Sequence, residues 1–265
     1  HFFNTKFWLL SIVTFFIFSL ISSSIYVFND IFDKEADSKH PEKKKRPIAS
    51  EEVSVFNGVM IGISILCIGL FFSYLVELSV FIIILLYIIN NIIYNLFSKK
   101  IPIADVFSIS IGFILRLLSG IYVIGDIPTP WIILCTMFLA LFLGFSKRRA
   151  ELMSIDIQYK TKIQQRPVLV KYNKKLLESL VNESSFGAII SYALFTLTSG
   201  KNSSLIITVP IVYYALIHYK MSLFNNKYGE EPDAVLLKDK ILWICIIAWL
   251  MLYLIIMFFD LNIFY

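Results

Sequence analysis

Residues 7–28 read FWLLSIVTFFIFSLISSSIYVF and are followed at residues 29–37 by NDIFDKEAD. A helix needs about 20 apolar residues to cross a bilayer core of about 30 Å, so the first stretch is long enough to span a membrane. The second stretch places an asparagine and four acidic residues at the end of that span. This combination predicts a membrane-embedded protein whose chemistry lies at one surface of the bilayer.

The composition of the whole chain supports this interpretation. Of the 265 residues, 58% are hydrophobic and 16% are charged, with a mean hydropathy of +0.76, whereas a soluble domain is roughly 45–50% apolar and about 25% charged. One water-soluble core cannot hold this excess, which excludes a soluble enzyme and a disordered chain. A secreted disulfide scaffold is excluded too, because the three cysteines lie inside long apolar runs.

Seven further stretches are long and apolar enough, or nearly so, to cross a bilayer. They cover residues 54–76, 79–97, 103–124, 130–146, 176–199, 203–221 and 241–259. Regular β-alternation is absent, and lipid offers no partner to unpaired backbone groups, so the spans are expected to be helices. The sequence therefore predicts an all-α integral membrane protein, with eight visible transmembrane helices in one domain over residues 1–265.

The basic residues fall on one side of this bundle. All of the 24 Lys and Arg except Lys6, Lys201 and Arg116 lie in or beside the loops at 29–52, 98–102, 147–175 and 222–240. Basic residues accumulate in loops that stay in the cytoplasm. We therefore expect a protein of the cell membrane whose active site faces the cytoplasm.

The first of these loops carries a cluster of oxygen ligands. Asp30, Asp33 and Asp37 recur at positions i, i+3 and i+7, so a helix that continued through them would place all three carboxylates on one face, with Asn29 one turn from Asp33. Like charges on one stripe repel each other, and oxygen ligands without His or Cys are typical of Mg²⁺. The alternative is a solvated helix end whose acids pair with nearby lysines, although acids at a helix C-terminus oppose the helix dipole.

A basic run, HPEKKKRPIAS, follows at residues 40–50. Carboxylates that hold Mg²⁺ beside Lys and Arg form the kind of site that a polyphosphate leaving group needs. We expect Lys43 and Arg46 to contact substrate. Lys44 and Lys45 are expected instead to be attracted to anionic lipid, as in an ordinary cytoplasmic loop.

The polar motif at 29–37, followed by His-Pro and by Arg-Pro-Ile-Ala-Ser, resembles that of the UbiA superfamily of intramembrane prenyltransferases. The resemblance implies a bundle of nine transmembrane helices and a lipid-open cavity that holds a Mg²⁺-bound diphosphate. Since the chain begins at His1 and is already apolar by Phe7, we expect one further helix in a missing N-terminal piece. The family pattern has Gly after Ile-Ala-Ser, where this chain has Glu51.

The later basic loop indicates a branch of the superfamily. It reads GFSKRRAEL at 144–152 and QRPVLVKY at 165–172, where ordinary UbiA-type enzymes carry a second aspartate-rich motif. This pattern is similar to that of the decaprenyl-phosphate phosphoribosyltransferases, and the similarity covers essentially the whole chain. It implies Mg²⁺-dependent transfer of 5-phosphoribose from phosphoribosyl pyrophosphate to a polyprenyl phosphate, with release of pyrophosphate, for cell-envelope glycan synthesis. No general base is required, because the attacking phosphate oxygen is already ionised.

The resemblance also suggests roles for the site residues. Four would hold the Mg²⁺-diphosphate, and the aspartates among them would be catalytic: Asn29, Asp30, Asp33 and Asp37. Two would contact pyrophosphate oxygens: Lys43 and Arg46. Three would contact the ribose 5-phosphate or the lipid phosphate: Lys147, Arg148 and Arg166.

Further residues within or beside the spans stay open. Arg116 would be costly in lipid unless it is paired or faces a watery cavity, and we expect it to line the lipid-phosphate cavity. Tyr94 could hydrogen-bond a phosphate or anchor its helix at the interface. Asp105 could contact metal or substrate, or cap its helix, and Asp239 has a structural or a site role. Two more candidates have no assigned role: Glu151 and Tyr172.

Two other functions stay open on the sequence. An aromatic prenyltransferase of quinone or haem biosynthesis would use a prenyl diphosphate, but would need a second acid pair. A transporter would be favoured by inverted repeats with interrupted helices, and no convincing repeat is seen. The expected partners are phosphoribosyl pyrophosphate, polyprenyl phosphate and membrane lipid. No nucleic acid is expected, and a homo-oligomer stays open.

Overall fold

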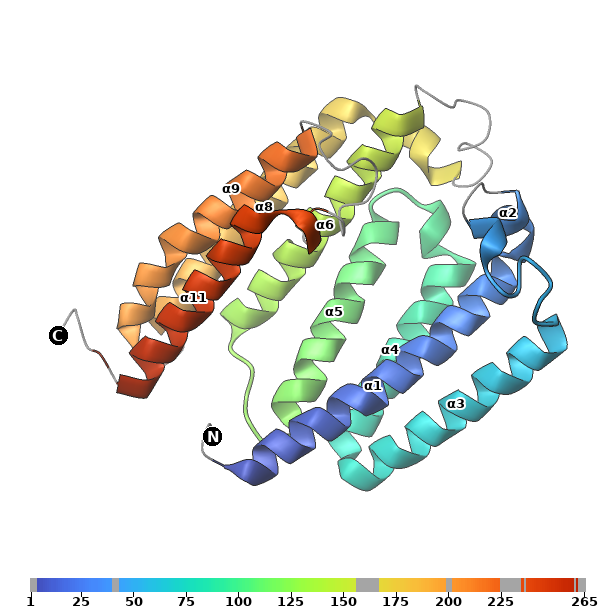
Figure 1. Ribbon diagram of the computed structural model, residues 1–265, viewed down its shortest axis with the longest axis horizontal. Helices are drawn as coiled ribbons and strands as arrows, with labels where there is room; N and C mark the ends of the chain where they lie inside the picture. The colour runs from blue at the N-terminus through green and yellow to red at the C-terminus, as the bar shows by residue number, and fades with distance from the viewer. Residues whose placement is uncertain are drawn as a thin grey trace. The chain divides into compact units, whose positions relative to one another are not determined.

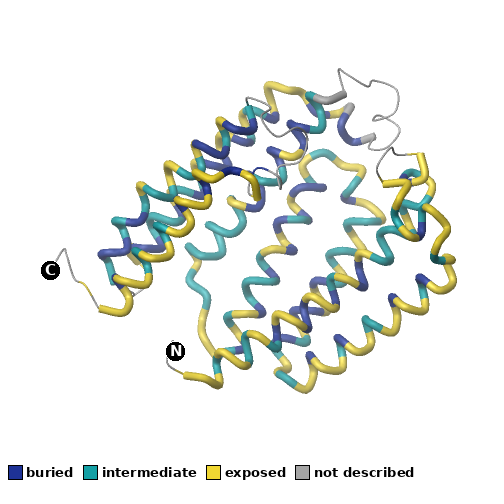
Figure 2. Tube along the Cα trace, in the orientation of Figure 1, coloured by how far each residue is buried: buried dark blue, intermediate teal, exposed yellow. Residues whose placement is uncertain are grey.

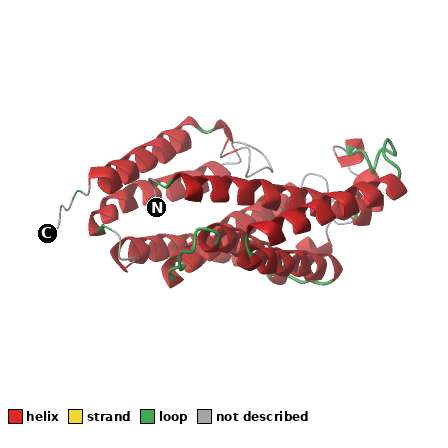
Figure 3. Cartoon of the chain, turned by 90° about the horizontal axis from the view of Figure 1, so that it is seen from below, coloured by secondary structure: helices red, strands yellow, loops and turns green. Residues whose placement is uncertain are grey.

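A computed structural model describes residues 4–39, 43–155, 167–198, 202–224, 235, 237–259 and 261. Within these ranges the chain is helical and contains no strand, as Figure 3 shows. Eight helices in the same ranges are long and apolar enough to cross a membrane. The predicted all-α, multi-pass membrane protein is thereby confirmed.

The helices form two compact units. The first unit contains α1 (Thr5–Phe32), α2 (Lys34–Ser38), η1 (Lys43–Lys45), α3 (Val55–Val76), α4 (Leu78–Leu96), η2 (Ser98–Lys100), α5 (Ala104–Tyr122) and η3 (Pro167–Lys171). The second contains α6 (Pro130–Ile155), α8 (Lys174–Thr198), η4 (Ser203–Thr208), α9 (Val209–Phe224) and α11 (Lys240–Phe259). That all of these helices belong to a single domain stays a prediction.

In the first unit α1 packs along α3, α4 and α5 (Figure 1). Ile17, Ile21 and Ile25 of α1 are buried in one core cluster together with Val80 and Ile84 of α4. Residues four apart share one face of a helix, so this stripe directs one side of α1 into the core. The residues that continue the chain beyond Ile25 are thereby held at the end of α4.

The contact between α1 and α3 is made by small residues. A Cβ atom on Gly62 would lie 3.0 Å from the Phe28 ring, and one on Gly69 would lie 2.6 Å from Ile21 Cδ1. The Ser24 hydroxyl donates to the Gly62 carbonyl at 2.8 Å. Small residues let membrane helices approach closely, and an interhelical hydrogen bond adds to their association. This close packing fixes the last turns of α1, from which the carboxylate segment emerges.

In the second unit α6 and α8 pack along each other, and α9 packs against α11. The sequence predicted a span over residues 130–146 followed by a loop, but α6 runs on to Ile155. The prediction of a loop from residue 147 is therefore wrong, because hydropathy detects the apolar part of a helix and not its polar continuation. Lys147, Arg148 and Glu151 thus lie on a helix.

We expect Gly187→Ala to lower the stability of the second unit. A Cβ atom at Gly187 would lie 2.7 Å from Cγ and Cδ1 of Phe138, at the base of a ring that cannot simply turn away. Overpacking of this kind costs about 1–3 kcal/mol. Thermal unfolding in detergent measures it, with Gly120→Ala as the control because nothing lies within 4 Å of a Cβ atom there. Equal midpoints for the two variants would contradict the packing argument.

Two helices expose apolar side chains along much of their length, as Figure 2 shows for α3 and α11. On α3 these include Phe56 and Phe71, which are 73% and 61% exposed, and on α11 they include Ile244 and Phe258, at 65% and 63%. Large apolar side chains exposed over whole helices mark a surface that contacts lipid rather than water.

Candidate active site

The carboxylate segment begins on the last turn of α1 and continues into the short helix α2. α1 ends at Phe32, and Asp33 stands between the two helices with ψ 6° while its backbone N–H donates to the Asn29 carbonyl at 2.9 Å. The single helix considered from the spacing is therefore interrupted at Asp33. This turn separates Asp37 from the face of α1 and allows it to be buried, at 4% exposure.

Arg46 joins two of the three aspartates. Its Nη1 atom lies 2.6 Å from Asp30 Oδ1 and 2.8 Å from Asp37 Oδ2. Lys43 Nζ lies 4.0 Å from the other oxygen of Asp37. The basic run thus folds back onto the acids, and one guanidinium nitrogen holds two carboxylates that would otherwise repel each other.

The third aspartate is held from a different helix end. Lys99, in η2 at the end of α4, donates to Asp33 Oδ1 at 2.9 Å. The Asn95 amide donates to the Asn29 side-chain oxygen and also to the Asn91 carbonyl. These contacts place Asn29 and Asp33 against the end of α4, beside the pair that Arg46 holds.

These residues fit a magnesium ion by their donor chemistry. Among the described residues, no three acidic, His or Cys side chains converge as a preformed metal group. Asp30 and Asp37 nevertheless place one oxygen each within 2.8 Å of a single cationic nitrogen. Mg²⁺ is commonly bound by one or two carboxylates plus substrate phosphates and water. A two-carboxylate site completed by a diphosphate is therefore compatible with this cluster.

Glu51 occupies the position where the family pattern has Gly. Its φ of 65° lies in the left-handed region, where a glycine is free of the strain that a Cβ atom brings. Lys34 donates to its carboxylate at 2.9 Å, and this hydrogen bond holds the pKa of Glu51 below its ordinary value. The backbone of the turn is thus the one that the glycine pattern indicates, although the residue differs.

The predicted basic group of the second unit lies at the polar end of α6. Lys147 is exposed, whereas Arg148 is 1% exposed and pairs with Glu151 at 2.7 Å. Arg149, which was not predicted as a site residue, pairs with Glu178 at 3.2 Å, and its guanidinium carbon lies 3.9 Å from the centre of the Phe224 ring. Helical continuation therefore sends three successive basic residues into different surroundings.

Asp239 joins two helices of the second unit. One carboxylate oxygen contacts His218 Nε2 and accepts from the Ser222 hydroxyl, both at 3.1 Å, and the other accepts from the backbone N–H of Ile241 at 2.9 Å. Burial acts to raise the pKa of Asp239, but these hydrogen bonds outweigh it and leave the pKa below its ordinary value. These contacts give Asp239 a structural part, as the residue that caps α11 and ties it to α9.

We expect Asp239→Ala to destabilise the protein by about 1–2 kcal/mol at neutral pH, as loss of a helix N-cap does. The lowered pKa means that the carboxylate stabilises the fold fully above the ordinary Asp pKa of about 3.9, and that this contribution is lost as the pH falls through the lowered value. The difference in unfolding midpoint between wild type and variant should therefore shrink between pH 7 and pH 3. Asp239→Asn keeps a side-chain oxygen that can accept from the Ile241 N–H, so it should lose less stability than Asp239→Ala. A pH-independent difference would contradict this account.

The structure gives the burial of three further predicted site residues but does not decide their roles. Tyr94 is half-buried near the end of α4, and Asp105 is 1% exposed in the first turn of α5. Tyr172 is 5% exposed, directly before α8. Arg166 lies outside the described residues. Their roles stay predictions.

Arg116, on α5, contacts side chains of two neighbouring helices. It donates to the Tyr87 hydroxyl at 2.7 Å and reaches the Ser22 hydroxyl at 3.4 Å. The rings of Phe18, Tyr87 and Phe113 lie 5.3–5.9 Å from its guanidinium carbon. Arg116 is thus placed among hydroxyl and aromatic groups of α1, α4 and α5.

Asn95, Lys99, Tyr87 and Ser22 contact predicted residues but were not predicted as site residues. One signal was present, because Asn91 and Asn95 stand four apart in an apolar span and so share a helix face. Polar side chains inside a membrane span face the protein interior or a cavity more often than lipid. The pairing of Lys99 with Asp33, across 66 residues, has no such local signal.

Comparison with known proteins gives consistent matches. Residues 2–238 match the UbiA prenyltransferase family. A decaprenyl-phosphate phosphoribosyltransferase of Mycolicibacterium smegmatis is 28% identical over 250 residues, which cover 90% of this chain and 77% of the relative. A protein of the same name from Corynebacterium glutamicum is 30% identical over 245 residues, covering 89% of this chain and 72% of the relative.

Solved structures with the same fold include a UbiA homolog from Archaeoglobus fulgidus bound to DMAPP and Mg²⁺. It superposes with a TM-score of 0.71 at 17% identity, over 91% of this chain and 85% of that chain. The same homolog bound to GPP and Mg²⁺ gives a TM-score of 0.70 at 16% identity, over 91% and 84%. At these identities the likeness shows the fold alone.

Proposed function

The chain belongs to the UbiA prenyltransferase family, and from this premise we propose that it transfers 5-phosphoribose from phosphoribosyl pyrophosphate to a polyprenyl phosphate. The names of the relatives support the phosphoribosyl group and the polyprenyl phosphate acceptor. The observation that carries the proposal is the joining of Asp30 and Asp37 by Arg46, with Lys43 beside them. Such a mixed cluster suits a diphosphate leaving group, and pyrophosphate would be released.

In this proposal Asp30, Asp33 and Asp37 are the catalytic aspartates, and Asn29 assists them. When bound there, Mg²⁺ would neutralise negative charge on the diphosphate. The side chains position the donor, because Arg46 can turn from the carboxylates to a phosphate oxygen while Lys43 stays within reach of Asp37. Solved relatives of this fold bound to Mg²⁺ support the choice of ion.

The reaction would proceed without a general base. An ionised phosphate oxygen of the polyprenyl phosphate attacks C1 of the ribose, and the bond from C1 to the pyrophosphate oxygen breaks. The electron pair leaves with pyrophosphate, so no proton has to move. Lysine and arginine side chains at the leaving group favour charge that develops in the transition state. Lys147, Arg148 and Arg166 stay proposed contacts for the other phosphates.

We place this chemistry at the cytoplasmic face of the membrane. Asp30 on the last turn of α1 and Asp37 on α2 precede the basic residues at 43–46, and the polar part of α6 carries Lys147, Arg148 and Arg149. The concentration of Lys and Arg on this side supports a cytoplasmic orientation. Soluble phosphoribosyl pyrophosphate could then enter from the cytoplasm, while the polyprenyl chain stays in lipid.

The purified protein tests the proposal directly. It is incubated in detergent with Mg²⁺, phosphoribosyl pyrophosphate labelled in the ribose, and polyprenyl phosphate, and the label in the organic phase is counted. Label is expected there only when all three are present, and chelation of Mg²⁺ by EDTA should remove it.

A second pair of substrates makes the test decisive. The same protein is given a labelled prenyl diphosphate and an aromatic acceptor, as an aromatic prenyltransferase would require. Turnover of this pair, with no transfer of ribose to polyprenyl phosphate, would overturn the proposal. Absence of both reactions, while the lipid is moved across vesicle membranes, would favour a transporter instead.

A further inference from the structure

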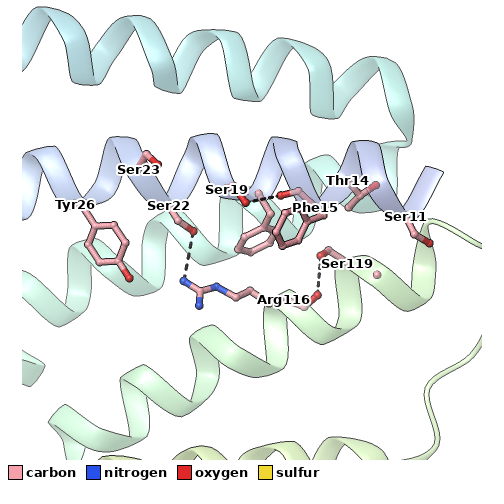
Figure 4. A pocket seen from close by; sticks show the side chains of 11 residues that line it. Ser11, Thr14, Phe15, Ser19, Ser22, Ser23, Tyr26, Arg116 and Ser119 are labelled. Atoms are coloured by element: carbon pink, nitrogen blue, oxygen red, sulfur yellow. Dashed lines mark hydrogen bonds between the residues drawn. The ribbon is translucent and has the colours of Figure 1, made fainter. Parts of the chain in front are cut away.

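A pocket of about 500 Å³ lies along α1 and α5 in the first unit (Figure 4). Arg116 contributes its charged side chain to this pocket. Six of the other lining residues carry a serine or threonine hydroxyl: Ser11, Thr14, Ser19, Ser22, Ser23 and Ser119. Phe15, Phe18 and Tyr26 line the pocket too, so it offers polar groups beside an apolar surface and suits a ligand that has both a polar and an apolar part.

Arg116 stands deep in the span, and its charge has no carboxylate partner among the described residues. It is twelve residues beyond Ala104, the first residue of α5, which corresponds to about 18 Å of helix. Its hydrogen-bond partners are Tyr87 and Ser22, and no acid in the described part of the chain forms an ion pair with it. An arginine at such depth is costly unless it faces water or an opposite charge. Three aromatic rings supply part of that compensation and leave the positive charge unmatched.

The direction of the arginine relates the pocket to the carboxylate cluster. Figure 4 shows the side chain of Arg116 extended along α1 toward Ser22, on the side of Tyr26. Ser22 precedes Asp30 by eight residues, or about 12 Å along the helix. The guanidinium therefore points toward the end of α1 that carries the aspartates, but it does not reach them.

We propose that this pocket binds a phosphate monoester through Arg116, with hydroxyl groups of α1 as further contacts. A guanidinium forms paired, charge-assisted hydrogen bonds with phosphate. One guanidinium with neutral hydroxyl donors matches the charge of a single phosphate. A diphosphate would instead bind where Mg²⁺, Arg46 and Lys43 are proposed to meet it. Both proposed substrates carry a phosphate monoester, namely the polyprenyl phosphate and the 5-phosphate of the donor. The assignment to a substrate rests on the proposed function, but the anion site does not.

Binding without turnover tests the pocket. The protein in detergent, without Mg²⁺, is titrated with geranylgeranyl phosphate, with ribose 5-phosphate and with geranylgeraniol, which lacks the phosphate. Arg116→Met is expected to weaken binding of one phosphate monoester by about ten- to a hundredfold and to leave geranylgeraniol unchanged. If Arg116→Met loses affinity for geranylgeranyl phosphate, the pocket binds the acceptor. If it loses affinity for ribose 5-phosphate, the pocket binds the donor.

Further variants guard against a folding defect. Arg116→Lys keeps the charge without the fork and should weaken binding less than Arg116→Met does. Lys6→Gln removes an exposed positive charge of α1 and should change nothing. Equal affinity of wild type, Arg116→Met and Arg116→Lys for both monoesters would overturn the pocket.

The readout separates this proposal from the proposed function. Arg116-dependent binding of a phosphate monoester by a protein that transfers no ribose would contradict the proposed function alone. Ribose transfer by a protein whose monoester affinity does not depend on Arg116 would contradict the pocket alone.

Discussion

Asp33→Asn is expected to lower kcat for ribose transfer by about a thousandfold or more, while the protein stays folded. Loss of one charged group that acts on the transition state costs about 10²–10³ in rate, and an amide is also a poorer ligand for Mg²⁺ than a carboxylate. The Asp33 side chain is 44% exposed and pairs with Lys99 at the end of α4. It is accessible to a soluble donor, and its replacement leaves no buried charge behind.

Glu35→Gln is the matched control for this variant. Glu35 lies in the same segment and is exposed, and its backbone carbonyl accepts a hydrogen bond from the Ser38 hydroxyl. The Glu35→Gln substitution removes one negative charge two residues from Asp33. It should leave kcat within about twofold of the wild-type value, because surface substitutions usually change little. Retained activity in Asp33→Asn, or an equal loss in both variants, would remove Asp33 from the proposed site.

Arg46→Met is expected to lower both activity and stability. It leaves Asp37, whose side chain is 6% exposed, without its 2.8 Å partner, and leaves Asp30 facing Asp37 without a cation between them. Breaking a fully buried pair costs about 3–5 kcal/mol, and we expect about 2–3 kcal/mol here because Arg46 itself is 41% exposed. The midpoint of thermal unfolding in detergent measures the loss.

The response of Arg46→Met to magnesium is the sharper part of this prediction. In the proposed site, Arg46 and Mg²⁺ would compete for the same carboxylate oxygens in the wild type, whereas in the variant only the ion would neutralise them. Mg²⁺ should therefore raise the unfolding midpoint more in Arg46→Met than in the wild type. Lys44→Met, from the same basic run but exposed, should lose less than about 0.5 kcal/mol and respond to Mg²⁺ as the wild type does. Equal stability of the two variants, or an equal response to Mg²⁺, would contradict the bridging role.

Much of the architecture could be predicted from the chain because it depends on local composition. The spans follow from the length of apolar runs, and all eight were found, although α6 proved longer than its apolar part. The UbiA-type fold, which the motif at 29–37 indicated, is confirmed by the family match and by the solved structures. Even the left-handed turn at Glu51 agrees with the glycine of the family pattern.

The composition of the candidate site could be predicted only in part. The aspartates and the basic run are neighbours in sequence, so their spacing already indicated a mixed cluster. The separate surroundings of Arg148 and Arg149 could not be predicted, because they depend on which side of α6 meets Glu151 or Glu178. Likewise, a structural and a site role both stood open for Asp239, and its contacts with His218 and Ser222 favour the structural role.

The order of residues along the chain is enough to indicate a helical membrane protein with an acidic and basic cluster at one end of its first span. The folded structure sets which partner each cation meets: Arg46 lies between Asp30 and Asp37, Lys99 pairs with Asp33, and Arg116 lies beside the Ser22 hydroxyl. The reason is that crossing a membrane is a property of each segment, which its own residues fix. Pairing of charges depends on distances between segments far apart in the chain, which only the packing of α1, α4 and α5 sets.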